Sequence, residues 1–194
     1  MNIGIFIYDQ AEVLDFSGPY EVFSTASRVY EDDGPFNVFL VGQTGEIVEA
    51  RAGYRVVPDY GFHNHPDIDV LVVVGGDHSG EMGNRVALEW IAEKAEKAQI
   101  VASVCTGVFL LAEAGVVQEG NVTTHWEDIP DLRKAYPNLN VRENVRWVDE
   151  GALITSGGIS AGIDMSLHLV SRLSSLDLAE RTAKQMEFSW TRNS

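Results

Sequence analysis

The chain has 194 residues, of which 45% are hydrophobic, and its formal net charge is −15. This length fits one domain over residues 1–194, and the acidic balance argues against bulk electrostatic binding to nucleic acid or to a membrane surface. A single cysteine excludes an internal disulfide framework and a multi-cysteine zinc site. With no signal peptide pattern and no apolar run that spans a bilayer, the sequence predicts a cytoplasmic protein.

Continuous apolar runs, separated by segments with helical periodicity, predict strands that are buried on both faces. Such strands are typical of an α/β fold with a mostly parallel central sheet and helices on each side. The predicted strands are residues 3–8, 38–41, 70–74 and 100–104.

The segments between and after these strands predict helices and two hairpins. The first helix is expected to begin near Gly18 and Pro19, because proline is favoured at the first helical position. Residues 145–148 and 152–155 favour a hairpin over a crossover, as do residues 47–50 and 54–58 at the edge of the sheet. The remaining predicted helices are residues 85–97, 160–173 and 178–188.

The only cysteine, Cys105, lies where an apolar strand pattern stops and a helical pattern begins. A residue on such a strand-to-helix turn projects its side chain outward, as in a nucleophile elbow, and a helix N-terminus lowers the pKa of a cysteine thiol. We therefore expect a nucleophilic Cys105 with a lowered pKa. The alternative is a free cysteine that packs as a small buried hydrophobe.

Four segments are expected to converge around Cys105 at the carboxyl ends of the strands, and the fourth comprises residues 123–126 and 157–164. Asp15 is a candidate proton donor, although it could also complement a helix dipole. The Gly75 and Gly76 amides could stabilise a developing negative charge, although a Gly-Gly pair commonly marks an ordinary turn. The Thr106 hydroxyl could contact a reacting atom or cap the following helix, and the two roles are compatible.

Two polar residues near later strand ends have competing interpretations. His125 could serve as a base for Cys105 or help to bind substrate, but a lone histidine is more often a hydrogen-bonded structural residue. Asp164 lies in the first turns of a predicted helix, where dipole complementation alone explains it. We expect no metal site and no cofactor, because no residue cluster suggests one.

Four segments, in this order and spacing, resemble the ThiJ/PfpI superfamily, and within it the isonitrile hydratases and the amino-terminal domains of AraC-type regulators. They are Leu14-Asp-Phe-Ser-Gly-Pro-Tyr-Glu-Val-Phe23, Ser103-Val-Cys-Thr-Gly107, Thr124-His-Trp126 and Gly158-Ile-Ser-Ala-Gly-Ile-Asp164. The resemblance covers essentially the whole chain. It implies a flavodoxin-like three-layer sandwich related to the class I glutamine amidotransferases, with Cys105 as nucleophile on an elbow, commonly in a homodimer.

The resemblance also implies an activity, in which Asp15 is the acid/base and Thr106 supplies a hydroxyl. That activity is the cofactor-independent addition of water to an isonitrile, a small-molecule substrate, to give an N-substituted formamide. Thr106 stands where the protease-like branch has histidine, which disfavours peptidase activity, and Val74 stands where proline often precedes the glycine pair. The alternatives are a glyoxalase or hydrolase acting on small carbonyl compounds, a redox-sensing stress protein, and a ligand-binding regulatory module.

Overall fold

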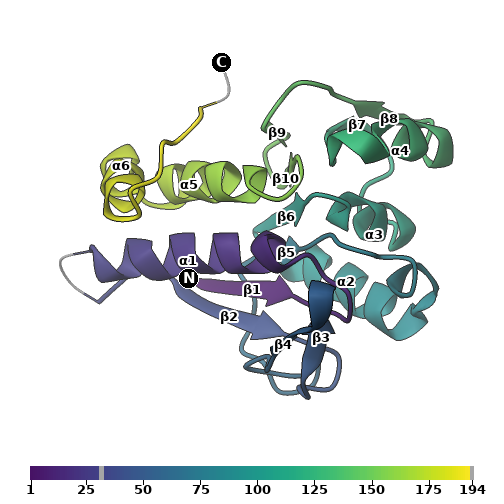
Figure 1. Ribbon diagram of the computed structural model, residues 1–194, viewed down its shortest axis with the longest axis horizontal. Helices are drawn as coiled ribbons and strands as arrows, with labels where there is room; N and C mark the ends of the chain where they lie inside the picture. Colours follow the sequence, from purple (N-terminus) through teal and green to yellow (C-terminus); the bar gives the residue numbers. More distant parts are fainter. Residues whose placement is uncertain (31–32, 193–194) are drawn as a thin grey trace.

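The computed structural model describes residues 1–30 and 33–192, and these form three layers around a six-stranded sheet (Figure 1). Five strands are parallel and the last one, β9, is antiparallel to β10. The predicted mostly parallel, flavodoxin-like fold is confirmed. The strand order is β2 (Asn37–Val41), β1 (Asn2–Phe6), β5 (Val70–Val73), β6 (Ile100–Val104), β10 (Leu153–Ser156) and β9 (Trp147–Asp149).

Helices cover both faces of this sheet. Three of them pack against one another on one face: α1 (Val13–Arg28), α5 (Ala161–Leu173) and α6 (Leu176–Gln185). The opposite face carries α2 (Arg85–Lys97), preceded by η2 (Glu81–Gly83), and α3 (Gly107–Glu113). Because helices shield both faces, the central strands are largely buried, and β5 is apolar and buried at each of its residues.

The first helix begins earlier than the sequence predicts. It starts at Val13, and Pro19 lies inside it. The helix continues through the proline because Phe16 and Phe23, seven residues apart, lie on the same buried face and pack into the core. Packing outweighs the hydrogen bond that the proline cannot donate. As a consequence, Asp15 lies in the first turn of α1 rather than ahead of the helix.

Smaller elements extend the two ends of the sheet. Both predicted hairpins are present, since β3 pairs with β4 and β9 pairs with β10 in antiparallel fashion. The pair β3–β4 forms a separate two-stranded sheet, whereas the sequence predicts it at the edge of the central sheet. A separate parallel pair, β7 with β8, and the short helix α4 were not predicted. The bounds are β3 (Val48–Ala50), η1 (Arg51–Gly53), β4 (Tyr54–Val56), β7 (Gly120–Val122), η3 (Trp126–Asp128), α4 (Ile129–Ala135) and β8 (Leu139–Val141).

The antiparallel edge strand β9 ends in a charged cluster. Asp149 accepts hydrogen bonds from Arg172 at 2.9 Å and lies 2.7 Å from His168 Nε2, both on α5. The His168 ring also stacks on Trp147, with 5.3 Å between ring centroids. These contacts fix β9 against α5. Among the described helices, none is long and apolar enough to cross a membrane.

Candidate active site

Cys105 lies on a tight turn between β6 and α3. Its backbone has φ of +57°, a left-handed conformation that is unusual for a residue with a side chain. Gly107 makes the turn possible, because a Cβ there would collide with the Val73 carbonyl. At Gly75 a Cβ would lie 2.9 Å from the Cys105 Cβ. Strand, turn and helix therefore approach as closely as a nucleophile elbow requires.

Hydrogen bonds between the Cys105 backbone and two other segments hold the elbow. The Cys105 amide donates to the carbonyls of Ser156 and Gly157, each at 3.2 Å. The Thr124 hydroxyl donates to the Cys105 carbonyl at 2.9 Å. Every polar backbone group of Cys105 therefore has a partner, and the unusual φ is held from both sides.

Asp15 is fully buried beside the thiol. One oxygen, Oδ2, accepts a hydrogen bond from the Gly75 amide at 3.1 Å, whereas Oδ1 has no partner at full hydrogen-bond distance. Burial raises the pKa of Asp15 to about 7, opposed by the Gly75 amide and, more weakly, by the Cys105 thiol and the Ile159 amide. At neutral pH the carboxyl can therefore either give or take a proton.

The prediction of a lowered thiol pKa is wrong. Only 6% of Cys105 is exposed, and this burial raises the pKa of the thiol, with a further increase from the negative charge of Asp15. The amides of Thr106 and Ile159 act in the opposite direction, but they are outweighed. Desolvation wins because the turn encloses the sulfur more deeply than the sequence pattern indicates. A proton on Asp15 removes the part of this increase that comes from its charge, whereas the larger part, which comes from burial, remains.

The glycine pair and Thr106 form a small hydrogen-bonded unit. The Gly76 amide donates to Thr106 Oγ1 at 3.0 Å, and this hydroxyl donates to the Gly76 carbonyl at 3.1 Å. The Thr106 side chain makes no cap to α3. The amides of Gly75 and Gly76, expected to stabilise negative charge on a ligand, are thus already engaged within the protein. They position Asp15 and Thr106 instead.

His125 lies to one side of the elbow. Its Nδ1 is 3.3 Å from a carboxylate oxygen of Asp128, and its ring rests on the backbone of Gly158, where no Cβ would fit. The carboxyl that meets the thiol is that of Asp15, so the structure does not support His125 as the base for Cys105. Instead His125 lines a cavity of about 300 Å³, which it shares with Thr124 and Ile159.

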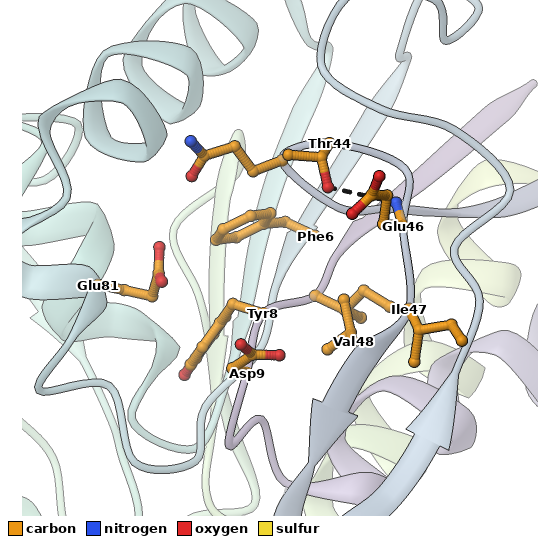
Figure 2. A pocket seen from close by; sticks show the side chains of 10 residues that line it. Phe6, Tyr8, Asp9, Thr44, Glu46, Ile47, Val48 and Glu81 are labelled. Atoms are coloured by element: carbon orange, nitrogen blue, oxygen red, sulfur yellow. Dashed lines mark hydrogen bonds between the residues drawn. The ribbon is translucent and has the colours of Figure 1, made fainter.

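A second cavity, of about 290 Å³, lies between the end of β1 and the β3–β4 hairpin (Figure 2). The side chains of Asp9, Glu46 and Glu81 line it together with those of Phe6 and Tyr8. The Tyr8 hydroxyl donates to the Val74 carbonyl at 3.2 Å. Burial raises its pKa, and the nearby charges of Asp15 and Cys105 raise it further. Tyr8 therefore both lines this cavity and lies near the thiol and the carboxyl.

Sequence reasoning missed Tyr8 and Ile159 as neighbours of the site. Tyr8 is part of an apolar run that was interpreted only as a strand. Ile159 lies in a motif that carried the family resemblance, and its φ of +54° is a feature that only the structure shows. Among the described residues, no group of three or more His, Cys, Asp or Glu side chains could hold a metal ion.

Comparison with known proteins gives one family. The model of the DJ-1/PfpI family matches residues 1–172. The isonitrile hydratase of Pseudomonas putida is 34% identical over 189 residues, covering 97% of this chain and 78% of the hydratase.

Regulators and solved structures also match. The transcriptional regulator GbdR of Pseudomonas aeruginosa is 24% identical over 192 residues. The match covers 99% of this chain and 52% of GbdR, so the chain spans about half the length of that regulator. The crystal structure of a ThiJ/PfpI family protein from Pseudomonas syringae superposes with a TM-score of 0.86 at 25% identity, covering 98% of this chain and 76% of that one.

Proposed function

Since the chain belongs to the DJ-1/PfpI family, we propose that it is a cysteine-dependent hydratase that adds water to an isonitrile and releases an N-substituted formamide. One observation carries the proposal: the only thiol of the chain meets a buried carboxyl that has an unpartnered oxygen and a pKa of about 7. The identity to an isonitrile hydratase over nearly the whole chain supports the choice of substrate.

In the first step a proton passes from the Cys105 thiol to Asp15 as sulfur attacks the terminal carbon of R–N≡C. A new S–C bond forms, and negative charge develops on that carbon. Asp15 then delivers its proton to the same carbon, which gives the thioimidate R–N=CH–S–Cys105 and an ionised Asp15. A carboxyl with a pKa near the working pH suits both proton transfers.

In the second step the Asp15 carboxylate accepts a proton from water, and the resulting hydroxide adds to the thioimidate carbon. Asp15 passes this proton to the nitrogen, giving R–NH–CH(OH)–S–Cys105. It then takes the hydroxyl proton as the C=O bond forms and the S–C bond breaks. The products are R–NH–CHO, the Cys105 thiolate and a protonated Asp15, so the net change is the addition of one water.

The unpartnered Oδ1 of Asp15 supplies the contact to substrate and water in both steps. The other oxygen stays bonded to the Gly75 amide, which keeps the carboxyl in place while the proton moves. The Thr106 hydroxyl secures Gly76 and so preserves this arrangement. Positioning of this kind is worth orders of magnitude in rate when it places the reacting groups correctly.

The proposal is tested by measuring formamide production from alkyl and aryl isonitriles, with mass spectrometry as the detection method. We expect Cys105→Ala to abolish turnover and Asp15→Asn to slow it by about 10²–10⁴-fold. Ser103→Ala is a matched control, because this buried serine on β6 has a hydroxyl without a partner. It should keep the wild-type rate.

Three outcomes would contradict the proposal. Formamide formation that survives in Cys105→Ala would remove the sulfur from the reaction. Turnover of methylglyoxal but of no isonitrile would instead indicate an enzyme for small carbonyl compounds. Thermal stabilisation by a ligand without any product would indicate a ligand-binding module.

A further inference from the structure

The turn at residues 157–160 joins β10 to α5 and closes over the elbow. The carbonyls of Ser156 and Gly157 accept the Cys105 amide, and the Ile159 amide faces both the thiol and the Asp15 carboxyl. Ile159 has a left-handed φ of +54°, which a β-branched residue rarely adopts. Such a conformation persists only when the surrounding structure imposes it.

Arg146, in the loop before β9, holds this turn at both ends. Its carbonyl accepts the Gly157 amide at 2.9 Å. Its guanidinium donates to the Ser160 hydroxyl at 3.2 Å and makes two bonds to Asp164 Oδ2, from Nε at 2.8 Å and from Nη2 at 2.5 Å. These two bonds to one carboxylate oxygen fix the plane of the guanidinium group, so Arg146 holds the turn in one orientation.

Asp164, the partner of Arg146, is held in place by burial and by further hydrogen bonds. Its side chain is fully buried in the first turn of α5. The second carboxylate oxygen accepts the Thr191 amide at 2.7 Å, and its backbone carbonyl accepts Trp190 Nε1 at 3.1 Å. The carboxylate therefore joins three segments, which is more than the dipole complementation that the sequence indicates.

We propose that Arg146, anchored by Asp164, is a positioning residue that holds the turn at residues 157–160 so that the Ile159 amide faces the sulfur of Cys105 and the carboxyl of Asp15. The effect that we expect on turnover rests on the proposed function. Its geometry and its first test do not depend on any substrate.

The expected consequence follows from the groups around the sulfur. The negative charges of Asp15 on α1 and Asp128 on η3 raise the pKa of the thiol. Tyr8, which follows β1, lies close to both Asp15 and Cys105. Against these, the amides of Thr106 and Ile159 favour the thiolate. Loss of the Ile159 amide therefore makes the thiol harder to ionise.

Alkylation by iodoacetamide measures this directly, because Cys105 is the only thiol in the chain. We expect Arg146→Met to move the pH profile of alkylation upward by about one unit, which is about tenfold in rate below the pKa. Arg146→Lys keeps a charge beside Asp164 but loses the fork, and should recover part of the rate. In isonitrile turnover, kcat should fall while KM changes little.

Two further variants separate positioning from general damage. Arg133 lies away from the turn, where it pairs with Glu143 and with the Val141 carbonyl. Its side chain is somewhat more exposed than that of Arg146, and Arg133→Met removes its charge. It should leave the alkylation profile unchanged. Ser160→Ala leaves the Arg146–Asp164 pair intact and removes only one bond to the turn, so a smaller upward shift is expected even where Arg146→Met folds poorly.

An unchanged alkylation profile in a folded Arg146→Met would overturn the proposal, as would an unchanged profile in Ser160→Ala when Arg146→Met does not fold. An equal shift in Arg133→Met would also overturn it, because the effect would then be general. A wild-type protein that alkylates as expected but turns over no isonitrile would contradict only the proposed function.

Discussion

The buried carboxyl of Asp15 links catalysis to stability. Its pKa of about 7 lies well above the ordinary value of 3.8, because burial penalises the ionised form. Between these two values the folded protein holds a proton that the unfolded chain has lost. The stability of the folded state therefore falls as the pH rises from about 4 to 7, and above pH 7 it stays lower by the full amount.

We expect Asp15→Asn to gain stability relative to wild type as the pH is raised from about 4 to about 8. The gain has an upper bound of about 4 kcal/mol, which is the pKa difference converted to free energy. Urea denaturation of both proteins across this range measures it. A difference between the two proteins that stays constant with pH would show that Asp15 titrates normally.

The sequence identifies Cys105 and Asp15 as partners, because each stands at a strand-to-helix junction and parallel strands bring such junctions to one edge. It does not predict their protonation. The pKa of Cys105 depends on the depth of the sulfur and on the distance to a carboxyl 90 positions away, and neither quantity has a local signal. The bonds of the Gly75 and Gly76 amides were unpredictable for the same reason.

At the scale of elements, local signals located the strands better than the helix ends. The apolar runs that form β1, β2, β5 and β6 are unambiguous because both faces are buried. The start of α1 was misplaced, since Pro19 is a strong local signal that the packing of Phe16 and Phe23 overrides. The pair β7–β8 has strands of three residues each, which are too short to show periodicity.

The helix α6 begins with a capping serine, which is a local signal that can be read from the sequence. The Ser175 hydroxyl accepts the Leu178 amide at 3.1 Å and so caps the helix. We expect Ser175→Ala to lower the free energy of unfolding by about 1 kcal/mol. Ser174→Ala, at the preceding exposed position, is the matched control. Equal denaturation midpoints for the two variants would argue against the cap.

The protein as a whole is strongly acidic. The chain has 29 acidic and 14 basic side chains, and its ion pairs are mostly exposed and individually weak. Mutual repulsion therefore opposes the compact state. This balance is visible in the sequence, whereas its distribution over the surface depends on the fold.

Screening should relieve that repulsion. We expect the thermal midpoint to rise when NaCl is increased from about 10 mM to about 150 mM, by an amount on the order of 1 kcal/mol, or about 2–4 °C. Calorimetry in NaCl and in KCl distinguishes screening, which is the same for both salts, from specific ion binding. A midpoint that stays flat or falls would show that the ion pairs outweigh the repulsion.

The sheet ends at β9, which carries the charged cluster around Asp149. In general, the edge strand of a sheet can recruit a strand from another chain. Here the strand has three residues, and Asp149 is tied to α5 by Arg172 and His168. We expect a short edge with a fixed carboxylate to be a poor template for amyloid-like growth.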